Sequence, residues 1–173
     1  YNWVQDNIKK VDKASNGKIG YIYIPDMGPE GLNEFSRYFY PQLDKEGLII
    51  DDRANGGGNV SPMILERLSR EPYRLTMRRG SVRIGTVPDA VQVGPKVCLI
   101  NKYSASDGDL FPWGFRALGL GKLIGTRTWG GIVGISGSLP YMDGTDIRVP
   151  FFTSFDPKTG NWIIENQGVD PDI

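Results

Sequence analysis

The sequence predicts an α/β fold in which a mainly parallel sheet is flanked by helices. Apolar runs of strand length alternate with segments of helical periodicity, in the order β-α-β-α-(β)-β-α-β. Parallel strands need crossovers of this kind, and helices usually supply them. The 173 residues are also enough to bury a proper core in one domain. We therefore expect one compact domain over residues 1–173.

The first strand and helix are predicted in the N-terminal quarter of the chain. Residues Gly17–Asp26 alternate apolar and polar positions and end at a Pro-Asp-Met-Gly break, which is typical of a strand that enters a loop. Residues Glu30–Leu43 follow with helical spacing, and Gly47 comes soon after them. The apolar positions of this helix are Leu32, Phe35, Phe39 and Leu43. An amphipathic helix should therefore cover one face of the sheet.

The second strand and helix enclose a loop rich in glycine. Residues Gly47–Arg53 form a short apolar run, Asn55–Asn59 read "NGGGN", and Ser-Pro opens a short helical segment at Pro62–Leu68.

Farther along, Lys96–Lys102 is a third apolar strand, and the "SASDGD" corner leads into a helix that reaches about Leu120. The strand "KLIGTRT" comes next, and after Gly130 the chain has strand-like, Gly-rich pieces without a convincing helix.

Composition argues against several classes of partner. Twenty basic residues balance twenty acidic ones, so no net field favours nucleic acid or an anionic membrane. No apolar stretch is long enough to cross a bilayer. The single cysteine, Cys98, lies in an apolar run and is interpreted as a core residue, and no cysteine pair has zinc spacing. We predict no metal and no cofactor.

Two distinctive loops follow apolar strands directly. In open α/β sheets, ligands bind beyond the carboxyl ends of the strands. If the strands before "NGGGN" and "YSASDGD" are parallel neighbours, both loops open onto one crevice. Three glycines in a row permit a close backbone approach, and free N–H groups there can hold an oxyanion. The second loop adds a hydroxyl at a helix start. Together the loops provide two parts of an acyl-transfer site.

Plainer interpretations of the same residues remain open at this point. The triple glycine fits an ordinary tight turn equally well, and the spacing of a dinucleotide-binding loop is absent. Ser106 and Asp109 match a capping box, in which the serine has a purely structural role. The sequence "DGD" lacks the rest of a calcium-binding loop. Trp113, Phe115 and Leu118 are expected in the core.

The chain resembles the tricorn branch of the S41 serine peptidases, in the C-terminal-processing-protease superfamily. Five blocks carry this resemblance in the same order, from about Gly17 to the end: "GKIGYIYIPDMGPEGLNEF", "LIIDDRANGGGN", "YSASDGDLF", "LGLGKLIGTRTWGGIVGI" and "ENQGVDPDI". The resemblance implies a ClpP/crotonase-like fold, as in the catalytic subdomains of S41 peptidases. It also implies serine-type hydrolysis of peptide bonds in oligopeptides or proteins.

The resemblance assigns roles to four residues. The nucleophile would be Ser106, and the oxyanion hole would be formed by the N–H groups of Asp107 and Gly58. Glu165 would help to orient the charge-relay system. Related processing proteases use a lysine base in the segment that contains Gly131, and its absence here agrees with the tricorn branch.

The tricorn branch uses a histidine base, and this chain contains no histidine. In tricorn-like proteins that histidine lies upstream, in a helical subdomain that precedes a PDZ-like module. The chain also begins at Tyr1 rather than Met. We therefore expect the C-terminal catalytic subdomain of a larger protease, which is inactive by itself and has the upstream parts of the same protein as partners.

Two other functions are compatible with the sequence. One is an inactive binding or assembly domain that kept the fold, and the other is a crotonase-like acyl-CoA enzyme. Tricorn relatives form rings, so a homo-oligomer is possible, and the resemblance favours a cytoplasmic location. The stretch "YRLTMRRG" lacks the carboxylate that gives tricorn its preference for basic residues, which speaks against trypsin-like specificity.

Overall fold

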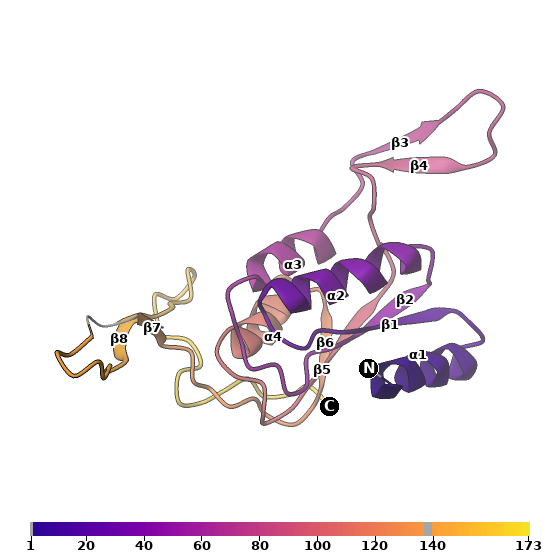
Figure 1. Cartoon of the computed structure of the whole chain (residues 1–173). Coiled ribbons are helices and arrows are strands. Elements are labelled where there is room, and N and C mark those ends of the chain that lie inside the picture. Colours follow the sequence, from indigo (N-terminus) through magenta and orange to yellow (C-terminus); the bar gives the residue numbers. More distant parts are fainter. Residues whose placement is uncertain (1, 137–139) are drawn as a thin grey trace.

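A computed structural model describes residues 2–136 and 140–173 of the chain (Figure 1). The helices are α1 Asn2–Ala14, α2 Pro29–Phe39, α3 Ser61–Leu68 and α4 Asp107–Ala117, with a 3₁₀ turn at Tyr40–Gln42. The strands are β1 Ile19–Tyr23, β2 Gly47–Asp51, β3 Arg74–Met77, β4 Ile84–Val87, β5 Lys96–Ile100, β6 Gly121–Gly125, β7 Gly134–Ser136 and β8 Val149–Phe152.

The central sheet has the order β1-β2-β5-β6, and each neighbouring pair is parallel. Strands therefore follow one another across the sheet in chain order. Because parallel crossovers are right-handed, successive crossovers in one direction place their helices on one face. Helices α2, α3 and α4 do lie together on that face (Figure 1). The predicted α/β class with a mainly parallel sheet is confirmed.

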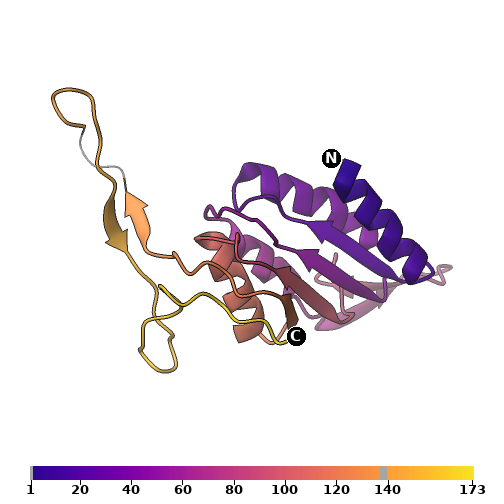
Figure 2. The ribbon, with the colours of Figure 1, turned by 90° about the horizontal axis from the view of Figure 1, so that it is seen from below.

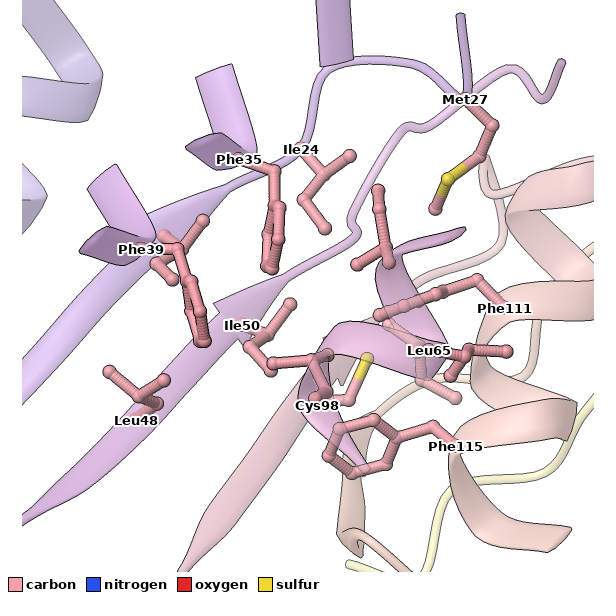
Figure 3. Close-up of a cluster of buried hydrophobic side chains, with 14 of the residues drawn as sticks. Ile24, Met27, Phe35, Phe39, Leu48, Ile50, Leu65, Cys98, Phe111 and Phe115 are labelled. Atoms are coloured by element: carbon pink, nitrogen blue, oxygen red, sulfur yellow. The ribbon is translucent and has the colours of Figure 1, made fainter. Parts of the chain in front are cut away.

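The hydrophobic core lies between this sheet face and the three helices (Figure 3). Alternate strand residues point into it, as the period of two in a strand requires. They are Ile22, Ile24, Leu48, Ile50, Cys98, Ile100 and Leu123. Aromatic rings from α2 and α4 meet them, namely Phe35, Phe39, Phe111 and Phe115. The predicted core position of Cys98 is confirmed.

Helix α1 covers part of the opposite face, beside β1 (Figure 1). The amide of Asn7 donates a hydrogen bond to the Tyr21 hydroxyl at 3.1 Å. The ring of Trp3 meets Tyr23 edge-on, with 5.2 Å between centroids. Tyr21 and Tyr23 alternate with core residues of the same strand, so their side chains point away from the core. Sequence analysis did not predict this helix.

Three local predictions differ from the structure. The α-helix predicted over Glu30–Leu43 ends at Phe39 and continues as a 3₁₀ turn, because Pro41 has no N–H to donate. Strand β6 stops at Gly125, short of the predicted "KLIGTRT". Leu118, expected in the core, is 54% exposed because α4 ends just before it.

Two antiparallel hairpins extend from this compact body (Figures 1 and 2). Strands β3 and β4 form one, and β7 and β8 form the other. The second hairpin corresponds to the strand-like pieces predicted after Gly130. In the described part of the chain, no helix has the length and apolar character needed to cross a membrane.

Candidate functional site

The two loops singled out from the sequence meet at the carboxyl ends of β2 and β5. The backbone N–H of Ala105 donates to the Asn55 carbonyl at 2.8 Å. The Asn101 side-chain oxygen accepts a hydrogen bond from the Ala54 N–H at 3.0 Å. The Ser104 hydroxyl donates to the Asp52 carbonyl at 2.8 Å. The prediction that both loops open onto one crevice is confirmed, and these bonds fix their relative position.

Ser106 lies on a strained turn between β5 and α4. Its φ of 56° and ψ of −122° are outside the ordinary regions for a residue with a side chain. Its N–H donates to the Gly131 carbonyl at 3.1 Å. The hydroxyl makes no capping hydrogen bond to the helix, so the capping-box interpretation is wrong for this side chain. Such strain costs about 1–3 kcal/mol and is concentrated at functional sites.

The glycine-rich loop packs directly against this serine. Gly57 has a φ of +99°, and a Cβ added there would lie only 2.6 Å from the Cβ of Ser106. Its N–H is held by the Asn55 side-chain oxygen at 2.9 Å, and its carbonyl accepts the Met27 N–H at 2.9 Å. A residue with a side chain would push the loop away from Ser106. Glycine is needed at this position because the loop lies so close to Ser106. The requirements of an ordinary tight turn would not explain this contact.

Two backbone N–H groups in the loops around Ser106 have no acceptor among the described residues. Asp107 is the first residue of α4, where no carbonyl of the preceding turn is available. Within residues 2–136 and 140–173, neither the Asp107 N–H nor the Gly58 N–H has an acceptor. The partial positive charge of the helix start adds to the field around Asp107. This arrangement can stabilise a developing oxyanion.

Two buried aspartates of α4 hold the surrounding segments. The Asp107 carboxylate accepts hydrogen bonds from the Ser61 hydroxyl at 2.5 Å and the Ser61 N–H at 2.9 Å, which ties α3 to α4. The Asp109 carboxylate accepts the Gly130 N–H at 2.8 Å. Burial raises the pKa of Asp109, although hydrogen bonds from Thr128 and Gly130 oppose the shift. Asp109 thus holds the segment that also contacts Ser106 through Gly131.

Glu165 comes from the C-terminal part of the chain and reaches the same pocket as Ser106. One carboxylate oxygen accepts the N–H groups of Ile132 and Val133 at 2.6 Å and 2.9 Å. The pocket has a volume of about 570 Å³, and both Glu165 and Ser106 line it. Gly58 and Gly131 lie in the same lining. Residues far apart in the sequence are therefore brought together around Ser106.

Sequence reasoning missed two buried residues beside the loops, Asn55 and Asp52, which contact the loops through the Asn55 side chain and the Asp52 backbone carbonyl. Asn55 is fully buried, and its amide also donates to the Ile24 carbonyl at 3.1 Å. Asp52 is fully buried, and neither of its carboxylate oxygens accepts a hydrogen bond of good geometry from the described residues, although the Asn55 amide lies close enough to oppose the rise in its pKa. Burial and then the neighbouring Asp51 carboxylate raise the pKa of Asp52 well above its ordinary value. The polar run "DDRANGG" at the end of a strand was the sequence signal that could have identified these two residues.

Among the described residues that line this pocket, Glu165 is the only one with an acidic or basic side chain. Arg127 forms an ion pair with Asp170 at 2.6 Å. Burial raises the pKa of the Cys98 thiol well above its ordinary value, which leaves it a poor nucleophile. The described residues contain no group of three or more His, Cys, Asp or Glu side chains that could hold a metal ion.

The sequence of this chain matches a known protein family. The model of peptidase family S41 matches residues 18–173. The chain belongs to peptidase family S41. Its relatives include the tricorn protease of Thermoplasma volcanium, which is 47% identical over 99% of this chain, and that of Thermoplasma acidophilum, which is 46% identical over the same share.

Solved structures agree with this S41 assignment. The crystal structure of the tricorn protease matches 98% of the chain with a TM-score of 0.90 at 45% identity. The photosystem II D1 C-terminal processing protease, at 21% identity and a TM-score of 0.63 over 90% of the chain, shares the fold. The chain spans only 16% of the length of the two Thermoplasma relatives and of the tricorn structure. The family and these relatives support peptidase chemistry.

Proposed function

We propose that this chain is the nucleophile-bearing part of a serine peptidase, with Ser106 as the nucleophile. The observation that carries the proposal is the strained Ser106 turn, together with two nearby N–H groups that have no acceptor in the described part of the chain. A structural helix cap needs no such strain, and the serine hydroxyl does not act as one. An acyl-CoA enzyme of the crotonase type would use the paired N–H groups but would not need Ser106.

The reaction would follow the ordinary course of acyl transfer. The Ser106 oxygen attacks the scissile carbonyl carbon while a base takes the hydroxyl proton. The carbonyl oxygen gains negative charge and accepts hydrogen bonds from the N–H groups of Asp107 and Gly58. The base then gives its proton to the leaving amine, and the peptide bond breaks. Water hydrolyses the resulting ester of Ser106 and regenerates the hydroxyl.

The general base would come from outside these 173 residues. The chain has no histidine, and Glu165 is the only acidic or basic side chain in the described pocket lining. Glu165 is oriented by two backbone N–H groups and would in turn orient the incoming base. Tricorn relatives are much longer than this chain. We assign the base to a histidine on another segment of the same polypeptide.

A fluorophosphonate probe tests this proposal. The 173-residue chain should label slowly, and added imidazole should accelerate labelling at least about 10-fold by replacing the missing base. Mass spectrometry should locate the adduct on Ser106. The Ser106→Ala variant should not label, whereas Ser69→Ala, which removes an exposed serine outside the pocket, should label normally. An adduct elsewhere, or none with imidazole present, would refute Ser106 as the nucleophile.

A further inference from the structure

Four of the residues that line the pocket beside Ser106 have large apolar side chains. They are Trp129, Val133, Ile135 and Phe152, and the same pocket is lined by Ser106 and Glu165. Ile135 comes from β7 and Phe152 from β8. The hairpin that extends from the sheet therefore contributes directly to the space around the proposed nucleophile.

Glycines leave room for both aromatic rings. A Cβ added to Gly134 would lie 1.9–2.4 Å from atoms of the Phe152 ring, which pairs with it across the two strands. A Cβ added to Gly131 would lie 2.2–2.8 Å from the Trp129 ring. Each ring therefore lies against bare backbone, in a position that any other residue would block. Glycine at these two positions therefore leaves room for the rings, although both remain more than half exposed.

The single charge among the described lining residues is the carboxylate of Glu165, which the proposed mechanism uses to orient the base. One of its oxygens already accepts two backbone hydrogen bonds. An acidic substrate side chain would be repelled by Glu165, and a basic one would have to share it. A large apolar side chain would instead be buried against the Trp129 and Phe152 rings.

We infer that this pocket selects peptides with a large apolar side chain next to the scissile carbonyl, such as phenylalanine or leucine. The inference rests on the proposed function, because Ser106 defines which bond is cleaved. Trp129, Ile135 and Phe152 are the residues that determine the specificity. Burial of one such side chain increases affinity by about 10- to 100-fold over glycine.

Binding of labelled peptides tests the inference without any need for catalysis. Fluorescein-labelled tripeptides of the form Ala-Ala-X, with X as Phe, Leu, Gly, Arg or Asp at a free carboxyl end, are titrated with the 173-residue chain. Fluorescence anisotropy should give the Phe and Leu peptides the highest affinity, about 10- to 100-fold above Gly. Affinity for the Arg peptide equal to or above that for Phe would overturn the inference, and so would equal binding of all five.

Adjacent phenylalanines of β8 provide a matched pair of variants. Both are more than half exposed, but only Phe152 lines the pocket. Phe152→Ala should weaken binding of the Phe peptide about 5- to 20-fold, and Phe151→Ala should change it less than about 2-fold. Equal effects of the two substitutions would show that the β7–β8 hairpin does not form part of the binding site. Val133→Asp should shift the preference toward the Arg peptide by placing a second carboxylate in the pocket.

The two proposals can fail separately. Fluorophosphonate labelling at Ser106 combined with peptide binding that ignores the side chain X would overturn the apolar specificity alone. Selective binding of the Phe and Leu peptides without labelling would overturn the peptidase assignment and leave an apolar peptide-binding pocket.

Discussion

The central sheet and the β7–β8 hairpin both carry many apolar side chains but use them in opposite ways. In the sheet and its helices, Phe39, Phe111 and Phe115 are completely buried. On the hairpin, Ile135, Phe151 and Phe152 are 55%, 75% and 58% exposed. Apolar residues in the first region stabilise the fold, and those in the second are available for binding.

The difference follows from what covers each sheet. Four parallel strands present a face on which three helices pack, and the side chains between them are buried. In the part of the chain that the structure describes, no third strand pairs with the β7–β8 hairpin, and a two-stranded ribbon has little stability of its own. Its side chains therefore remain at the surface. An apolar pattern in a strand predicts burial only when another element is available to cover it.

The largest effect expected is loss of stability from the core. Phe115→Ala removes a fully buried ring and should lower the free energy of unfolding by about 3–5 kcal/mol. Phe152→Ala removes a ring of similar size from the hairpin and should cost less than about 1 kcal/mol. Urea unfolding of both variants measures the difference. Similar losses would mean that the hairpin belongs to the cooperative core.

A smaller loss of stability is expected from a substitution in the glycine-rich loop where it contacts Ser106. Gly57→Ala places a Cβ against Ser106 at a φ of +99°, and should cost about 1–3 kcal/mol and reduce fluorophosphonate labelling. Gly56 is the matched control, because a Cβ there meets nothing within 4 Å. Thermal unfolding and labelling rates measure both variants. If Gly56→Ala and Gly57→Ala behaved alike, the close approach to Ser106 would not matter.

The smallest effect concerns pH and the buried Asp52. Because its pKa is raised in the folded state, the folded chain holds a proton that the unfolded chain releases above about pH 4. Stability therefore falls as pH rises from there toward the raised pKa. Asp52→Asn removes this contribution, so its melting temperature should rise relative to the parent chain as pH increases from 5 to 8.

The exposed Asp44 provides the control for net charge. Asp44→Asn removes one negative charge without altering a buried group, and its melting temperature should follow the parent chain. A constant difference between Asp52→Asn and the parent chain across this pH range would contradict a raised pKa for Asp52.

The sequence predicted the regions where local pattern and final environment agree. The strands around Ile22, Ile50 and Cys98 were predicted correctly, because the apolar residues that mark them in the sequence are the ones that the helices bury. The N-terminal helix was missed although its Trp3 and Asn7 contact β1. Leu118 was assigned to the core because periodicity cannot show where a helix ends. The single-domain prediction for residues 1–173 stays a prediction.

The sequence by itself determined the parallel α/β order, the two loops at strand ends and, through five blocks of resemblance, the S41 family. Tertiary structure alone decided that Ser106 is strained and does not cap its helix, since φ and ψ at one turn depend on the loops packed around it. It also decided that Glu165 and Phe152 share a pocket with Ser106. No local pattern encodes such contacts, because the residues come from segments far apart in the chain.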